Sequence, residues 1–175
     1  VTPGIIDAHS HTGVEGNVNE CTDAITAEVR IADVIDHHDI NVYRELAGGV
    51  TAVNVLHGSC NAIGGQNAVI KLRWGKAPEA LLMEGAPRGI KFALGENVTR
   101  KRGLAPTNPQ RFPSTRQGVE YVIRDAFTRA QAYRKGWPEY EAQKKAGQDV
   151  LAPRRDLQLD ALVEILEGKR LVHAH

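Results

Sequence analysis

Several features that mark specialised protein classes are scarce in this sequence. The 175 residues include only two cysteines, one methionine and 5% aromatic residues. The two cysteines, Cys21 and Cys60, are too few for a disulfide framework, and no C-x-x-C spacing is present. They can still pair with each other in an oxidising compartment, which the sequence alone leaves open.

The sequence also lacks an excess charge of one sign and a long apolar run. Its 22 Lys and Arg residues balance 21 Asp and Glu residues, for a net charge of +1. We therefore expect no general attraction to nucleic acid or anionic lipid. No apolar run approaches the about 20 residues of a membrane span, and no signal-peptide pattern is present. Because the first residue is Val1 and not an initiator Met, the compartment stays open between the cytoplasm and the periplasm or exterior.

The remaining composition, 42% hydrophobic and 25% charged, is that of an ordinary globular domain. A chain of this size can bury roughly two thirds of its unfolded surface. A complete eight-fold β/α barrel needs about 250 residues, so the chain is too short for one.

Strands and helices are expected to alternate. β-branched and apolar runs predict strands at 3–11, 50–56, 68–72, 88–95 and 170–175, and Gly-rich residues 60–66 predict a loop. Helices are predicted over 39–46 and around 159–167. Another helix is predicted to start at a capping box formed by Ser114 and Gln117 and to break at 136–138, and a polar helix is expected to follow it to about 146. Three prolines, Pro106, Pro109 and Pro113, predict an extended loop. This alternation is typical of the α/β class with a parallel sheet.

Two of the seven histidines end the first predicted strand. His9 and His11 are two residues apart, so on a strand their side chains point to the same face. Two imidazoles can therefore converge on one zinc or another first-row metal ion. Ordinary surface or hydrogen-bonded histidines are the alternative. In parallel α/β folds, catalytic groups gather at strand C-termini, which favours the metal site.

A second H-x-H pair, His173 and His175, ends the last predicted strand. If the two strands are neighbours in one parallel sheet, all four imidazoles lie at the same edge. A remnant of a terminal tag is the alternative, although the preceding Leu-Val is typical of a native strand. His37 and His38 are adjacent in sequence, so we expect them to be surface residues that do not share a site.

Residues 3–11 (PGIIDAHSH) resemble the P-G-hydrophobic-hydrophobic-D-x-H-x-H signature of the amidohydrolase superfamily. Residues 48–53 (GGVTAV) are similar to the G-V-T-T-V second strand of that family, nearest to its imidazolonepropionase-like and prolidase-like branch. The resemblance implies a metal-dependent hydrolase on a distorted β/α barrel. Residues 1–175 would then be a fragment of one catalytic domain, a partial barrel covering about strands one to five.

The resemblance assigns metal ligands residue by residue. His9 and His11 match the first-strand ligands, and His173 matches the fifth-strand histidine better than His175 does, although the order can be reversed. Lys91 resembles the fourth-strand lysine that bridges two metals once it is carboxylated by CO2. Its alternative is an ordinary lysine whose stem covers apolar surface. A lysine within an apolar run is costly to bury unless it is paired or modified.

The remaining site assignments concern the substrate side. His57 follows the second strand, and the segment through Gln66 is expected to face the substrate or to support the ligands, as is His175. A Gly-rich connector is the alternative for this segment. The implied cofactor is Zn²⁺, with two ions if Lys91 is carboxylated and one if it is not.

The implied reaction is water activation and hydrolysis of a C–N bond in a small cyclic amide, a dipeptide or a related compound. In the family, a sixth-strand His and an eighth-strand Asp complete the site, and the Asp is the general base. Both are expected beyond His175, so this fragment is expected to be inactive and to pair with the remainder of the same barrel. A homo-oligomer is a further partner that the sequence leaves open. The alternative function is a non-catalytic, zinc-stabilised binding or structural domain.

Overall fold

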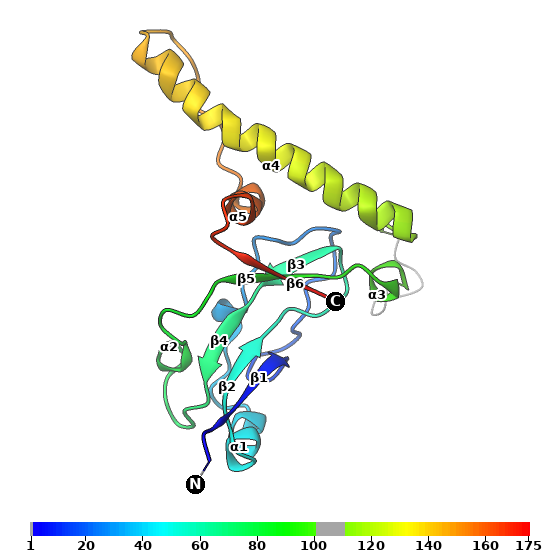
Figure 1. The fold of residues 1–175 in the computed structure, drawn as a ribbon, viewed down its shortest axis with the longest axis vertical. Coiled ribbons are helices and arrows are strands. Elements are labelled where there is room, and N and C mark those ends of the chain that lie inside the picture. Colours follow the sequence, from blue (N-terminus) through cyan, green and yellow to red (C-terminus); the bar gives the residue numbers. More distant parts are fainter. Residues whose placement is uncertain (1, 101–110) are drawn as a thin grey trace.

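The fold was analysed in a computed structural model, which describes residues 2–100 and 111–175. Two three-stranded sheets form its centre (Figure 1). In the first, the order is β1 (Ile5–Ser10), β2 (Val50–Val55) and β4 (Ala68–Lys71). In the second, the order is β3 (Ile63–Gln66), β5 (Gly89–Phe92) and β6 (Leu171–Ala174). The pairs β1–β2 and β5–β6 are parallel, whereas β2–β4 and β3–β5 are antiparallel.

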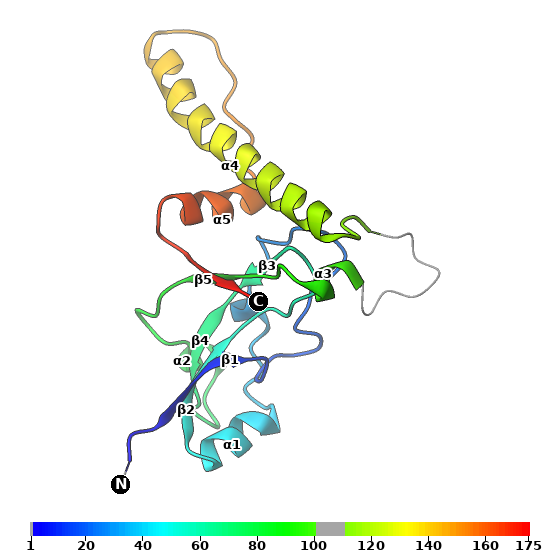
Figure 2. The same ribbon diagram turned by 45° about the vertical axis from the view of Figure 1, so that its right-hand side comes forward.

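Helices surround these sheets unevenly. A 3-10 helix, η1 (Ile31–Val34), and three short helices, α1 (Ile40–Ala47), α2 (Pro78–Leu81) and α3 (Glu96–Arg100), lie beside the strands. The long helix α4 (Arg116–Lys145) projects beyond the rest of the molecule, and α5 (Leu157–Leu166) lies between it and the strands (Figures 1 and 2). Within the described ranges, no helix has the length and apolar character needed to cross a bilayer.

The α/β class is confirmed, but the expectation of a parallel sheet is wrong for β3 and β4, and the two sheets do not close into a barrel. Parallel neighbours need a crossover of about a dozen residues or more, usually a helix. Residues 56–67 separate β2 from β4 and contain β3, which pairs in the other sheet, but no crossover helix. The chain therefore returns antiparallel. Residues 60–66, predicted as a loop, contain β3 because Gly64 and Gly65 fit against the side chains of His57 and Val29.

Two apolar cores hold the elements in place. One joins the β3–β5–β6 sheet to α4 and α5 through residues such as Ile63, Ile90, Val122 and Leu162. The other joins the β1–β2–β4 sheet to α1 and α2 through Val42, Val53, Ile70 and Leu81. Burial of each such side chain stabilises the fold by about 1.5–3 kcal/mol relative to exposure.

The apolar run of the first strand is typical of a buried strand, but most of its side chains are exposed. Ile5 is 57% and Ile6 71% exposed, because β1 lies at the edge of its sheet with β2 as its neighbour on one side. At the edge of the other sheet, Leu171 and Val172 of β6 are also exposed.

Helix α4 differs from its prediction at its start and at the predicted break. Its N-cap is Thr115, one residue after the predicted Ser114, and the Thr115 hydroxyl accepts a hydrogen bond from the amide of Gly118. The expected break is absent, since Pro138 lies inside one continuous helix. Tyr133 packs edge-on against Trp137 and donates a hydrogen bond to Asp160 of α5, which holds the helix near the proline. Of the predicted proline loop, Pro106 and Pro109 lie outside the described residues.

Candidate metal centre

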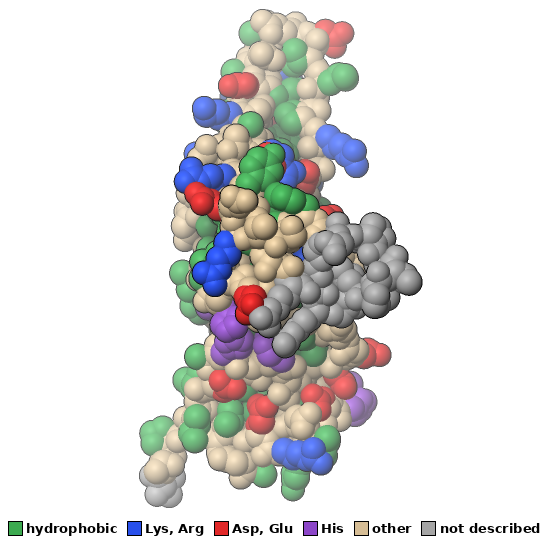
Figure 3. Space-filling view, turned by 90° about the vertical axis from the view of Figure 1, so that its right-hand side faces the viewer, with side chains coloured by type: hydrophobic (Ala, Val, Ile, Leu, Met, Phe, Trp, Pro, Cys, Tyr) green, Lys and Arg blue, Asp and Glu red, His purple; other side chains and the backbone are tan. Residues whose placement is uncertain are grey.

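The two H-x-H pairs meet although their strands belong to different sheets. His9 and His11 are at the end of β1, and their ring centroids are 5.1 Å apart. The ring of His175, directly after β6, lies 6.0 Å from that of His9. Histidine side chains accordingly gather on one face of the molecule (Figure 3). With Lys91 of β5, these three histidines form a group that we call the histidine–lysine cluster.

Lys91 is the buried member of the histidine–lysine cluster. Its side chain is 1% exposed, and its Nζ lies 3.4 Å from Nε2 of His9. Burial lowers the pKa of this ammonium group. No ion pair joins Lys91 to a carboxylate among the described residues. A buried lysine without an acidic partner favours the neutral amine, which is nucleophilic.

The surroundings orient two of the imidazoles. Nδ1 of His11 donates a hydrogen bond to the carbonyl of Leu56 at 2.7 Å, which leaves its Nε2 outside that bond. Nδ1 of His175 is hydrogen-bonded to the Ser59 hydroxyl at 2.9 Å, which leaves its Nε2 outside that bond. Metal-binding histidines in proteins are held by their second nitrogen in the same manner.

The surroundings of His9 favour its neutral form. Its pKa is lowered by burial and by the neighbouring charges of Lys91, His11 and His175. Its backbone amide donates to the carboxylate of Asp7 at 3.0 Å. A neutral imidazole is the form that binds metals.

His173 lies next to Lys91 in the parallel β5–β6 register and is half-buried. Burial and the Lys91 charge lower its pKa. Its ring passes over Gly89, since a Cβ atom at Gly89 would come within 2.4 Å of His173 Nε2. His173 thus lies beside Gly89 and Lys91, whereas His175 is the member of this pair that lies beside His9.

The structure does not bring His57 and Gln66 into the histidine–lysine cluster. His57 is 1% exposed, its Nδ1 donates to the Gly58 carbonyl, and its Nε2 accepts from the Glu20 amide. Both ring nitrogens thus bind backbone, and burial lowers the pKa of the ring. Gln66 donates to the Ala27 carbonyl and lines a charged cavity with Arg30 and Arg88.

Some supporting residues carry no local signal in the sequence. Ser59 contacts His175 across 116 positions. Cys21 and Cys60 form a disulfide beside it, and the Arg111 guanidinium donates to the carbonyls of both cysteines. The cysteine pair could be suspected from its count alone, but no spacing rule relates Ser59 or Arg111 to their partners.

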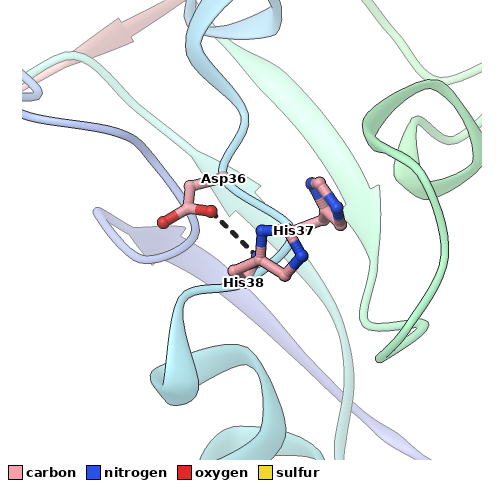
Figure 4. Close-up of side chains that lie close together, drawn as sticks. All are labelled: Asp36, His37 and His38. Atoms are coloured by element: carbon pink, nitrogen blue, oxygen red, sulfur yellow. Dashed lines mark hydrogen bonds between the residues drawn. The ribbon is translucent and has the colours of Figure 1, made fainter.

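A different group of ligands lies before α1. Among the described residues, Asp36, His37 and His38 are the group of three His, Cys, Asp or Glu residues whose ligand atoms lie within 4.8 Å of one another (Figure 4). The expectation that His37 and His38 cannot share a site is therefore wrong, because a turn does not send adjacent side chains to opposite faces as a strand does. The histidines of the histidine–lysine cluster do not meet this distance criterion.

Comparison with known proteins places this geometry in context. No protein-family model matches the chain. The curated amidohydrolase tasK of Hapsidospora irregularis is 37% identical over 196 aligned residues, which cover the whole chain and 20% of that protein. The crystal structure of an amidohydrolase from Thermotoga maritima MSB8 aligns with a TM-score of 0.82 and 36% identity. The predicted relationship to amidohydrolases is confirmed.

The relationship covers only part of each relative. This amidohydrolase-related chain aligns over 99% of its own length with 45% of the Thermotoga protein, and with a smaller share of tasK. The shared fold and sequence identity thus relate this chain to a part of each amidohydrolase.

Proposed function

We propose that this segment supplies the metal-binding part of a hydrolase active site that acts on a C–N bond in a small cyclic amide, a dipeptide or a related compound. The observation that carries the proposal is the burial of Lys91 against His9, without a carboxylate partner in the described residues. The proposed ligands are His9, His11, Lys91 and one of His173 and His175, as the sequence motif predicts. The contact between His175 and His9 favours His175 over the predicted His173.

The donor set fits a divalent metal such as Zn²⁺. Three imidazoles of the histidine–lysine cluster offer nitrogen donors, but their ligand atoms do not all lie within 4.8 Å of one another. A carboxylated Lys91 would supply the missing bridge: its neutral amine adds to CO2 and loses one proton, giving a carbamate with two oxygen donors. A zinc ion held by these residues would lower the pKa of a bound water toward 7.

Neighbouring groups of the protein would orient the histidine ligands. Leu56 fixes the His11 tautomer through its carbonyl, and Ser59 holds the ring of His175. The cluster is open on one face, where histidine side chains are visible at the surface, so a small substrate can approach from that side (Figure 3).

The general base is proposed to come from the remainder of the same barrel. The exposed strands β1 and β6 are free to be covered by further strands at the outer edge of each sheet. We propose that residues 1–175 alone do not turn over substrate.

The test uses the chain alone and the chain joined to the part of the Thermotoga amidohydrolase that lies outside the alignment. Metal content of the purified chain and ¹³C NMR with labelled bicarbonate measure metal and carbamate directly. We expect both signals in the native chain and in an Asp149→Asn control, whose substitution lies at an exposed loop position. In Lys91→Met we expect the carbamate signal to disappear and the metal content to fall.

The joined protein is assayed on a panel of cyclic amides and dipeptides. Hydrolysis that disappears in His9→Ala and His11→Ala supports the proposal. Hydrolysis that survives both substitutions refutes these roles. A chain that holds zinc, unfolds on chelation and never hydrolyses any member of the panel supports the alternative of a zinc-stabilised structural domain.

A further inference from the structure

The residues Asp36, His37 and His38, which we call the 36–38 triad, lie in the turn between η1 and α1. They are separate from the histidine–lysine cluster, because no side-chain hydrogen bond or ring contact among the described residues joins the two groups. Asp36 and His37 are half-buried and His38 is exposed, so solvent reaches the group. The three side chains offer two imidazoles and one carboxylate, a donor set that suits zinc and related first-row metals.

The donor atoms are available for a ligand. Asp36 uses one carboxylate oxygen, Oδ1, to accept the His38 amide at 2.8 Å, and this bond leaves Oδ2 (Figure 4). Within the described part of the chain, the rings of His37 and His38 contact each other and form no hydrogen bond through their nitrogens. Among the described residues, the ring nitrogens of both imidazoles are therefore not engaged by another protein group.

The spacing requires only a small adjustment to bind an ion. Two nitrogens bound to tetrahedral zinc at about 2.0–2.1 Å lie about 3.3 Å apart. The rings of His37 and His38 are 3.8 Å apart between centroids and are tilted by 40° to each other. The ligand atoms of all three residues already lie within 4.8 Å of one another.

The backbone that carries the triad is fixed on both sides. The Asp36 amide donates to the Gly13 carbonyl at 2.9 Å. Asp39 caps α1 by accepting from Asn41 and also accepts from the Gly13 amide at 2.8 Å. A turn held by these bonds reduces the ordering that ligand binding would otherwise require.

We propose that Asp36, His37 and His38 form a binding site for a divalent first-row metal ion, with Zn²⁺ as the best fit, outside the hydrolase centre. Three protein ligands leave a fourth tetrahedral position for water. The site would tie η1 to α1 and does not depend on the proposed function of the histidine–lysine cluster.

The test starts from a His9→Ala/His11→Ala background, which removes the first-strand ligands of the other centre. Zn²⁺ is titrated in competition with a chromophoric chelator, and Co²⁺ is titrated in parallel to record the d–d absorption of a four-coordinate site. We expect the background to bind one equivalent, and the added His37→Ala/His38→Ala pair to abolish it. Asp36→Asn keeps the bond to the His38 amide but removes the charge, so affinity should fall by about tenfold or more, as even partners of metal ligands change affinity this much.

Asp33→Asn is the matched control, because it removes a nearby carboxylate that is bound to Arg30 and not to the triad. It should leave the affinity within twofold of the background. Circular dichroism of every variant checks the fold. Because His38 is exposed, we expect its replacement by alanine to leave the fold intact. Unchanged stoichiometry in His37→Ala/His38→Ala, or the same loss in Asp33→Asn as in Asp36→Asn, would overturn the proposal.

Discussion

At the scale of single residues, Lys91 has the most unusual environment. It is buried in a strand, contacts His9, and has no carboxylate to balance its charge among the described residues. Burying an unpaired ammonium group in a protein interior destabilises the native state by several kcal/mol unless it loses its proton. Such a position is poor for stability and suitable for chemistry, because the neutral amine can react.

The first prediction separates these two roles of Lys91. Lys91→Met replaces a buried amine by an apolar chain of similar length, so the metal-free chain should be at least as stable in urea unfolding. Lys91→Ala leaves a cavity and should lower the free energy of unfolding by about 2–5 kcal/mol. Metal content should fall in both variants. Retention of full metal content in Lys91→Met would contradict the ligand role.

The second prediction concerns His57 and pH. Because burial lowers the pKa of His57, the native state binds fewer protons than the unfolded chain near and below pH 6.5. Stability is therefore complete above about pH 6.5 and falls as the pH drops below it. His57→Gln keeps a side-chain acceptor for the Glu20 amide and removes the titration.

The free energy of unfolding is measured between pH 7.5 and 5.5 for both proteins. We expect a shallower decrease in His57→Gln than in the native chain. His9 and His173, whose pKa values burial also lowers, keep the remaining slope in both. Equal slopes would show that His57 is not held neutral.

The sequence predicted the residues that lie in strand-end patterns and missed those that act across the chain. His9, His11 and Lys91 could be found because a two-residue spacing and a lysine in an apolar run are local signals. The same local reasoning placed His57 and Gln66 at the substrate, but it could not see that backbone groups occupy both nitrogens of His57. Ser59 and Arg111 contact their partners from more than 50 positions away, and no period or motif encodes such contacts.

At the scale of elements, the predictions failed where tertiary contacts override local preference. The triplet at 136–138 was expected to end a helix, since proline removes a backbone donor and clashes with the preceding turn. Helix α4 continues through it because Tyr133 is anchored to both Trp137 and Asp160. Strand β3 contains two glycines and has weak strand propensity, and it forms through pairing with β5.

The third prediction tests the start of α4. The sequence indicates Ser114 as the cap, whereas the structure has Thr115 accepting from the Gly118 amide. Thr115→Ala should therefore reduce the free energy of unfolding by about 1 kcal/mol, a typical cost of losing an N-cap. Ser114→Ala, one residue away, is the matched control and should change stability by less than about 0.5 kcal/mol. Chemical denaturation of the two variants decides between the two caps, and the reverse order of effects would restore the sequence-based assignment.

At the scale of the whole molecule, the most prominent feature is the exposed sheet edge formed by β1 in one sheet and by β6 in the other. Strands β1 and β6 each have a neighbour on one side and carry exposed apolar side chains, including Ile6 and Leu171. Unpaired strand edges with apolar residues are templates for pairing with another chain.

The fourth prediction follows from these edges. In the absence of a covering partner, the 175-residue chain should self-associate with increasing concentration in sedimentation velocity. Threonine is compatible with a strand, so Ile6→Thr and Leu171→Thr should preserve β1 and β6 while removing apolar surface. Together, the two substitutions should shift the chain toward monomer. Leu151→Thr is the matched control, because Leu151 is 96% exposed but lies outside every strand. Association that is equal in the edge variant and in the control would assign it to another surface, whereas a monomer at every concentration would show that the exposed edges do not pair.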